Sequence, residues 1–343
     1  MRLLSLILTA TILAAPHAQA AQCTVTKLTS FDADMSSSRI VVKASIDGQA
    51  VSAMLDTGLP FNMISKALVE KLKLQKTRAD NVMQTSTYSY LRHNGAIPSV
   101  PPDDPTMMDP AGGVPEFLTA AHTVAFGDIK TEGTPFYVMG EPSKGDPGPD
   151  VIFGANFLET YDLEIDPAHG KVNIFFSDHC PGTVVYWTNR FGSVPIAITK
   201  DGHISLPVAV NGTETHAFLD TGSPMSLVDN NLAKSTLGID PAADGGQLEY
   251  LTEPSGKHLA FYQHTFDSFD FGGAQFNQTS MGIAPDMLNW VTKSFVHDPQ
   301  GSLRHDATIN SPVTLGMNHI QKLRLYFAFR ENTLYFTKAG EGD

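Results

Sequence analysis

Two copies of the tripeptide Asp-Thr-Gly are the residues of this chain best suited to chemistry. They are Asp56-Thr57-Gly58 and Asp220-Thr221-Gly222, which lie 164 positions apart. Hydrolysis of an amide without a metal ion or a covalent nucleophile needs one group that deprotonates water and another that protonates the leaving nitrogen. Two carboxylates a few ångströms apart cannot both ionise easily, so such a pair retains one proton and supplies both groups. The pattern therefore predicts a catalytic pair, Asp56 and Asp220, with no cofactor and no metal ion.

Other interpretations of the two tripeptides stay open. A single Asp-Thr-Gly is often an ordinary turn, although two copies in register argue against this. The same scaffold could bind peptides in the periplasm without cleaving them, or serve only as a structural protein of the cell envelope. Metal chemistry has less support, because the chain has no H-E-x-x-H motif and because His258 and His264 lack a carboxylate at ligand spacing.

A duplicated strand-turn-strand frame carries both tripeptides. Residues 39–65 align without a gap onto residues 203–229. Each copy places a tight turn, Asp47-Gly48 or Asn211-Gly212, between two apolar strands, and the second strand ends in Asp-Thr-Gly. The frame therefore predicts that the two aspartates occupy equivalent positions.

Short helices are expected shortly after each tripeptide. Ser65 and Asp229 are residue types that commonly cap the start of a helix, and they predict helices over 66–74 and 230–237. Apart from these helices, most of the chain has the pattern of β-strands.

A second repeated block follows about a hundred residues after each tripeptide. Residues 151–158 match residues 313–320, and each block places two apolar or β-prone residues before a glycine, Gly154 or Gly316. Closing strands are expected after both blocks, over 161–165, 171–176, 322–329 and 333–336. The chain is therefore a tandem duplication, with an N-terminal lobe over 21–181 and a C-terminal lobe over 182–343. Residues 184–187 and 194–199 are expected to join the lobes as strands.

With its paired Asp-Thr-Gly loops and apolar-apolar-Gly blocks, the chain resembles the pepsin-like and retropepsin-like aspartic proteases. The resemblance implies an all-β, bilobal pepsin-like architecture of two tandem retropepsin-like β-barrel lobes with short helices. It implies an aspartic endopeptidase in which Thr57 and Thr221 bond across to the opposite loop. Gly58 and Gly222 would let backbone amides approach the carboxylates. By the same resemblance, Gly154 and Gly316 would let a second strand pack beneath each loop.

The resemblance also implies a β-hairpin flap over the substrate. Residues 83–91, with Tyr88 and Tyr90, lie at a suitable distance after the first tripeptide, and residues 248–262 form the counterpart hairpin around Ser255-Gly256. Residues 98–115 contain six prolines, which predicts an inserted loop.

The two loops differ in the residue that follows the glycine. The second loop has Ser223, whose hydroxyl is expected to bond the outer oxygen of Asp220, whereas the first has Leu59, which offers no hydroxyl and desolvates Asp56. We therefore hypothesise that Asp220 ionises more readily and that Asp56 more often holds the proton, with an activity optimum less acidic than that of a gastric enzyme.

The first twenty residues have the pattern of a secretory signal peptide. Arg2 supplies the positive start, residues 3–15 are apolar, and Ala18-Gln19-Ala20 matches an A-x-A cleavage site. We expect a secreted or periplasmic protein. Its two cysteines, Cys23 and Cys180, then favour one disulfide bond over two buried thiols.

Composition limits the kinds of partner. The chain has 23 basic and 36 acidic residues, a formal net charge of −13, and no basic cluster, which argues against nucleic acid. Beyond the signal peptide, no apolar run approaches the ~18 residues of a membrane span. The expected partner is a peptide or protein substrate bound between the lobes of a monomer.

Overall fold

The computed structural model describes residues 23–59, 61–78, 117–139, 148–199, 203–252, 258–284 and 311–342. The expected signal peptide, the flap residues Tyr88 and Tyr90, the proline-rich residues 98–115 and the tip Ser255-Gly256 lie outside the described residues. The domain boundaries after residues 20 and 181 stay predictions. No helix in the described ranges is long and apolar enough to cross a bilayer.

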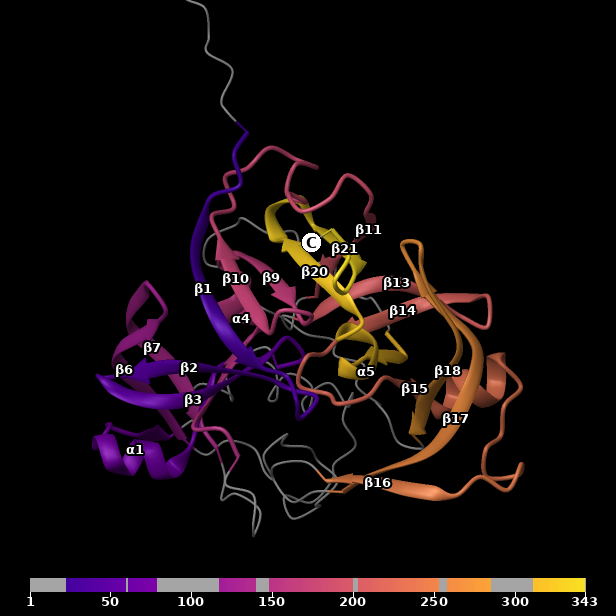
Figure 1. The fold of residues 1–343 in the computed structure, drawn as a ribbon. Helices are drawn as coiled ribbons and strands as arrows, with labels where there is room; N and C mark the ends of the chain where they lie inside the picture. The colour runs from indigo at the N-terminus through magenta and orange to yellow at the C-terminus, as the bar shows by residue number, and fades with distance from the viewer. Residues whose placement is uncertain are drawn as a thin grey trace, which may run out of the picture.

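Two sets of six strands close into barrels, one in each half of the chain (Figure 1). In the first barrel, pairing of Ser45 and Ile46 with Ala125 and Val124 closes the set. Its strands in order are β2 (Ile40–Ile46), β3 (Gln49–Asp56), β8 (Val151–Gly154), β4 (Met63–Ile64), β7 (Ile129–Val138) and β6 (Phe117–Phe126). In the second barrel they are β13 (Ile204–Val210), β14 (Thr213–Leu219), β19 (Val313–Leu315), β15 (Leu227–Asp229), β18 (Ala274–Ala284) and β17 (His258–Phe271). The expected all-β, two-barrel architecture is confirmed.

The duplicated frame is visible in the matching hairpins of the two barrels. Strands β2 and β3 are joined by Asp47-Gly48, and β13 and β14 by Asn211-Gly212, with φ angles of 48° and 81° in the first turn and 48° and 75° in the second. Positive φ at both central residues is the two-residue turn that matches the twist of a hairpin. The Asp47 carboxylate accepts the N–H of Thr123, and the Asn211 amide oxygen likewise accepts an N–H from β17.

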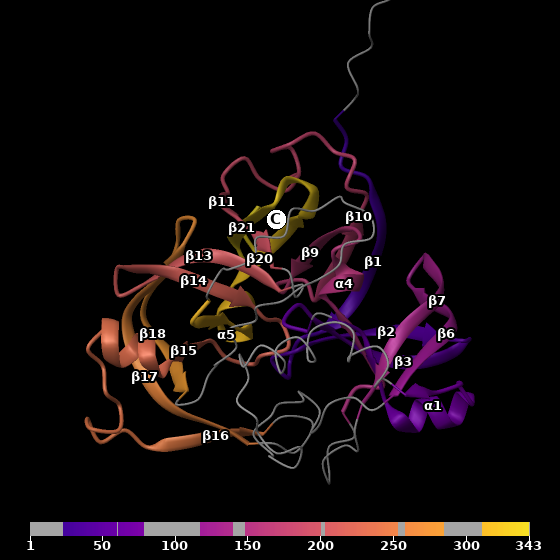
Figure 2. The same ribbon diagram turned by 180° about the vertical axis from the view of Figure 1, so that it is seen from behind.

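A six-stranded antiparallel sheet joins the two halves, with β13 and β14 on one side of it and β2 and β3 on the other (Figures 1 and 2). The first half contributes β1 (Lys27–Asp34), β10 (Lys171–Phe175) and β9 (Asp162–Asp166). The second contributes β20 (Leu323–Ala328), β21 (Thr333–Lys338) and β11 (Gly192–Pro195). The halves meet where β9 pairs with β20, for example at Ile165 and Leu325.

The segment between the halves covers one face of this sheet. Alternate residues of the central strands, such as Leu163 and Phe327, join the barrel core, whereas Asp162 and Tyr326 are buried on the opposite face. Val184, from the connecting segment, is fully buried against Tyr326 and its neighbours. The expectation of a strand over 184–187 is wrong, because this segment packs on the face of the sheet rather than pairing at its edge.

Buried charges on the covered face connect the halves. His179, in the connecting segment, contacts the Asp162 carboxylate through Nε2 and lies 3.0 Å from Glu331 Oε1 through Nδ1. Asp162 belongs to the first half and Glu331 to the second. Nearby, the Arg324 guanidinium binds Glu164 across the β9–β20 pairing. These contacts fix the relative position of the two halves.

The predicted disulfide bond between Cys23 and Cys180 is present, with the two Cα atoms 5.1 Å apart. It fastens the start of β1 to the connecting segment, one residue beyond His179, and closes a loop with a sequence separation of 157. We expect the Cys23→Ser/Cys180→Ser variant to lose about 2–5 kcal/mol of unfolding free energy, because its unfolded state is less constrained. Urea denaturation of the oxidised parent and the variant measures the loss. Equal midpoints for the two proteins would show that the bond does not contribute.

The helices begin where the sequence predicts, but they differ in length or type. Ser65 caps helix α1 (Lys66–Leu72) by accepting the N–H of Leu68. In the second half Asp229 accepts the N–H of Asn231, but the turn that follows, Leu232–Thr236, is π-helical. One-turn helices that were not predicted, α4 (Ala155–Leu158) and α5 (Met317–Ile320), form the second halves of the two repeated blocks, directly after Gly154 and Gly316. The remaining short strands are β5 (Thr77–Arg78), β12 (Ala197–Ile198) and β16 (Leu248–Thr252).

Candidate functional site

Each Asp-Thr-Gly loop is held by the strand beside it. Asp56 ends β3 and lies opposite Gly154 in the parallel pairing with β8. Asp220 follows β14 directly, and its N–H donates to the carbonyl of Leu315 in β19 at 2.9 Å. The duplicated frame therefore places both aspartates at the ends of equivalent strands.

The two threonines lock the loops together, as the resemblance implied. Thr57 Oγ1 donates to the carbonyl of Leu219 at 2.9 Å, and Thr221 Oγ1 donates to the carbonyl of Leu55 at 2.8 Å. Each hydroxyl also accepts the N–H of the opposite threonine, at 3.0 and 3.1 Å. Both threonines are buried, so these four bonds are shielded from competing water.

The glycines of the tripeptides allow the aspartates to approach the opposite loop. A Cβ added to Gly58 would lie 2.3 Å from Cγ of Asp220, and one added to Gly222 would lie 2.3 Å from Oδ2 of Asp56. Neither space accepts a side chain. Each aspartate is therefore packed against the backbone of the other loop, which brings the two carboxyl groups together.

The surroundings of the two carboxyl groups favour retention of a proton by the pair. Burial, and then the charge of Asp220, raise the pKa of Asp56 well above its usual range. Burial also raises the pKa of Asp220, but N–H groups of Gly222 and Ser223 and a hydrogen bond from Asp56 oppose that rise. The pKa of Asp56 is therefore raised further than that of Asp220, which is the direction that the hypothesis of a protonated Asp56 and an ionised Asp220 expects. This arrangement offers an acid and a base side by side.

The expected bond from the Ser223 hydroxyl to Asp220 is wrong. Ser223 Oγ donates to the carbonyl of Met225 at 2.8 Å, and a hydroxyl has only one hydrogen to donate. The backbone N–H of Ser223 contacts Asp220 instead, at 3.0 Å. In the first loop, Leu59 is buried in an apolar cluster and supplies no hydroxyl at the equivalent position.

Close packing explains the glycines of the second repeated block. A Cβ on Gly154 would lie 2.4 Å from the carbonyl oxygen of Phe61, and one on Gly316 would lie 2.3 Å from that of Met225. These glycines therefore let β8 and β19 pass directly beneath the loops, as the resemblance implied.

Sequence reasoning missed two residues that hold these glycines. The Asn62 side-chain oxygen accepts the N–H of Gly154 at 3.1 Å, and Ser226 Oγ accepts that of Gly316 at 2.9 Å. Asn62 and Ser226 occupy equivalent positions in the aligned copies. Two buried polar residues in otherwise apolar runs were the signal that could have identified them.

Gly58→Ala is expected to lower kcat/KM for any reaction of the pair by about 10²-fold, because its methyl group displaces the Asp220 carboxylate by about 1 Å. Gly48→Ala is the matched control. Its Cβ meets open space, so it costs stability through its positive φ and leaves the pair intact. Equal rate losses in the two variants would contradict the assigned role of Gly58.

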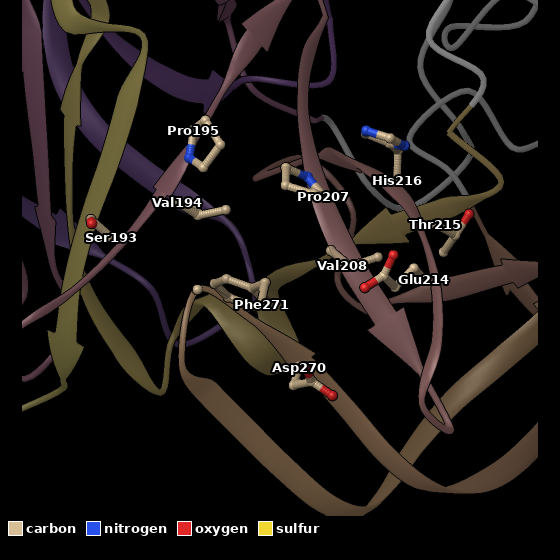
Figure 3. A pocket seen from close by; sticks show the side chains of 11 residues that line it. Ser193, Val194, Pro195, Pro207, Val208, Glu214, Thr215, His216, Asp270 and Phe271 are labelled. Carbon is tan, nitrogen blue, oxygen red and sulfur yellow. The ribbon is translucent and has the colours of Figure 1, made fainter.

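A pocket of about 590 Å³ is lined by residues of β11 and of the second barrel's β13, β14 and β17 (Figure 3). Along one edge, β13 pairs with β14, including Pro207 with His216; along its other edge it pairs with β12 at Ile204 and Ser205 and with β17 at Ala209 and Val210, so that edge is unpaired at Pro207. Neither aspartate of the pair lines this pocket. Within the described ranges, no group of three or more histidine, cysteine, aspartate or glutamate residues could hold a metal ion.

Comparison with known families agrees with this geometry. The aspartyl protease family matches residues 42–157 and 206–318, one match in each half. The chain therefore belongs to the aspartyl protease family. It carries the family's unit twice in one polypeptide, with one Asp-Thr-Gly loop in each copy.

Similar solved structures have low sequence identity to this chain. An aspartic proteinase from Irpex lacteus is 13% identical, covering 91% of this chain and 97% of its own, with a TM-score of 0.49. A retropepsin-like aspartic protease from Rickettsia conorii is 18% identical, covering 43% and 90%, with a TM-score of 0.29. Basic 7S globulin from soybean is 9% identical, covering 92% and 95%, with a TM-score of 0.44. No curated protein matches the chain in sequence.

Proposed function

We propose that this protein is an exported aspartic endopeptidase. In this proposal Asp220, which carries the charge, deprotonates a water molecule, and Asp56, which carries the proton, protonates the oxygen that develops charge on the scissile carbonyl. The water attacks the carbonyl carbon, and the tetrahedral intermediate then expels the amine, which takes a proton from the pair. No cofactor enters these steps.

The observation that carries the proposal is the reciprocal bonding of Thr57 and Thr221. Four hydrogen bonds across the two loops fix a geometry that a simple pair of turns does not need. The geometry forces two partly buried carboxyl groups together, which is costly for stability. Such a cost is typical of a site whose purpose is chemistry.

We propose that the substrate is an extended peptide with an apolar side chain near the scissile bond. Strand alternation places Met54 on the same face of β3 as Asp56. Met54 is buried with Leu59 and Ile152, and Phe61 and Tyr137 lie partly exposed against this cluster. An apolar substrate residue would extend the cluster and remove its exposed surface from water.

Export is supported by the signal-peptide pattern of residues 1–20 and by the disulfide bond, which needs an oxidising compartment to persist. N-terminal sequencing of the protein isolated from the cell envelope or medium tests this part. A mature chain that starts at Ala21 is the expected result.

Cleavage of a peptide library tests the activity. The purified protein is incubated with the library from about pH 3 to about pH 8, with and without pepstatin, and products are read by mass spectrometry. Pepstatin-sensitive cleavage next to apolar residues supports the proposal. Peptide binding without cleavage at any pH would instead indicate a peptide-binding protein on the same scaffold.

A further inference from the structure

A fully buried histidine lies beneath the second loop and has no counterpart in the first half. His319 is in α5, one residue before the end of the second copy of the repeated block. Phe157 occupies the equivalent place in the first half and packs against the apolar core. The polar residue is therefore specific to the half that supplies Asp220.

His319 bonds to the residue that holds Gly316. Its Nδ1 lies 2.8 Å from Ser226 Oγ, and its Nε2 lies 2.7 Å from Thr279 Oγ1. Ser226 Oγ in turn accepts the N–H of Gly316. Phe269 and Phe276 pack against the imidazole in T-shaped arrangements, with ring centroids 5.1 and 4.8 Å away.

One tautomer of His319 completes this chain of bonds. With the hydrogen on Nε2, His319 donates to Thr279 and leaves Nδ1 to accept the Ser226 hydroxyl hydrogen. The Ser226 oxygen then presents a lone pair to the Gly316 N–H. Asn318 Oδ1 accepts the backbone N–H of Ser226 at 2.7 Å and also lies 3.0 Å from Ser226 Oγ. The Ser226 hydroxyl therefore has Nδ1 of His319 and Oδ1 of Asn318 as alternative acceptors, and the scheme assigns its hydrogen to Nδ1.

Gly316 in turn belongs to the support of the second loop. The carbonyl of Leu315, just before it, accepts the Asp220 N–H, and the N–H of Met317, just after it, donates to the carbonyl of Ser223. A shift of Gly316 therefore moves both ends of the Asp220 loop. Through Ser226, the imidazole acts on the carboxylate that the proposed mechanism uses as its base.

We propose that His319, as a neutral imidazole, is a positioning residue for the Asp220 loop, and that its protonation weakens the junction at Gly316. This inference rests on the proposed function only where it concerns catalysis. Protonation would turn Nδ1 into a donor aimed at Ser226 and would leave a buried charge without a carboxylate among the groups that bond His319.

The charged surroundings agree with a neutral ring. Burial, and then the charge of Lys322, lower the pKa of His319 to about 4. The other groups packed against the ring are the hydroxyls of Ser226 and Thr279, the Asn318 amide and the two phenylalanines. Lys322, which follows α5, lies with its Nζ 5.5 Å from the Phe276 ring.

Stability should therefore depend on pH through this residue. An unfolded histidine binds its proton near pH 6.5, whereas folded His319 binds it only near pH 4. The unfolded state therefore binds more protons in this interval, so the contribution of His319 is complete above pH 6.5 and is lost as pH falls toward about 4.

Two variants separate positioning from space filling. Asparagine places its side-chain oxygen near the position of Nδ1, where it accepts from Ser226 without titrating. Glutamine reaches toward Thr279 and leaves Ser226 without that acceptor. His319→Phe copies the first half and fills the space without polar contacts.

The test measures amide hydrogen exchange of Gly316, the pH dependence of the melting temperature, and kcat/KM. We expect His319→Gln and His319→Phe to speed Gly316 exchange by about tenfold, and His319→Asn to restore protection. We also expect His319→Asn to lose less melting temperature than the parent between about pH 7 and about pH 4. If the protein cleaves peptides, we expect kcat to fall in His319→Gln and His319→Phe and to be retained in His319→Asn, while KM changes little in all three variants.

The exchange and melting measurements do not require catalysis, so they decide the inference even if the proposed function fails. Gly316 protection that is equal in His319→Asn and His319→Gln would overturn the positioning role. Nitrogen chemical shifts that place the ring hydrogen of the neutral parent on Nδ1 would overturn the bonding scheme.

Discussion

Asp220→Asn and Asp56→Asn are each expected to reduce kcat/KM for peptide cleavage by about 10²–10⁴-fold while making the folded protein more stable at neutral pH. Asparagine cannot accept a proton from water or deliver one to the substrate. The double variant should be little slower than either single variant, because the two carboxyl groups act as one unit. Single-turnover cleavage of a fluorogenic peptide measures the loss.

The gain in stability follows from the direction of the pKa shifts. Free Asp56 ionises near its ordinary pKa of 3.8, but burial and Asp220 keep it protonated to higher pH in the folded protein. The folded state therefore binds more protons above that pH, so parent stability falls as pH rises through the interval. Asparagine removes this dependence. The melting temperatures of Asp56→Asn and the parent should therefore differ near pH 7 and become equal below pH 3.8. Retained activity in the variant would contradict the assignment. So would a melting temperature below that of the parent at pH 7.

Arg324→Met is expected to destabilise the protein by about 3–5 kcal/mol, because it leaves buried carboxylates without their cation. Arg324 Nε lies 2.7 Å from Glu164 Oε1 and 3.3 Å from Asp166 Oδ2, and all three side chains are nearly inaccessible to water. Since the bond crosses between β20 and β9, its loss should weaken the joint between the halves. Urea denaturation measures the change.

Two further variants make this prediction specific. Lys171→Met removes an ion pair with Asp32 that is open to solvent, and it should leave the denaturation midpoint almost unchanged. Arg324→Met/Glu164→Leu removes both partners of the main buried pair and should recover part of the loss. A double variant less stable than Arg324→Met would show that Glu164 has a separate stabilising role.

The local features of this fold could be predicted from the sequence because short-range physics determines them. The turns at Asp47-Gly48 and Asn211-Gly212 need residues that tolerate positive φ, and the sequence supplies them. The duplication then implies that the two tripeptides are equivalent. The family resemblance, and not the local sequence, implied that the two tripeptides contact each other across the halves. In the structure, Thr57 and Thr221 make that contact.

The covered face of the joining sheet could not be predicted in the same way. Asp162, Glu164 and Asp166 alternate with apolar residues, which is the usual pattern of a strand with one face in water. They are buried because the connecting segment folds over them, because Arg324 pairs with Glu164, and because His179 contacts the Asp162 carboxylate. Arg324 lies 160 residues from Glu164, and His179 lies 17 residues from Asp162 in a segment of irregular structure, so no periodic pattern within the strand indicates the burial.

The proposed role of His319 could not be predicted from the sequence for a related reason. A single histidine in an apolar run is usually an ordinary core residue, and its partners Ser226 and Thr279 lie 93 and 40 residues earlier in the chain. The only signal in the sequence is the alignment of the two halves, in which a polar residue, His319, stands where the first half has the apolar Phe157.

The pairing of β9 with β20 has a consequence for the order of folding during synthesis. The first half can complete its barrel and its three strands of the joining sheet before β20 is made. Until then β9 is an exposed edge strand, open to pairing with another nascent chain. The acidic residues along β9 then act as gatekeepers, because like charges repel a second copy of the same edge. Once β20 has been synthesised and pairs with β9, Arg324 binds Glu164. The same acidic residues that oppose pairing between incomplete chains then take part in the contact between the two halves.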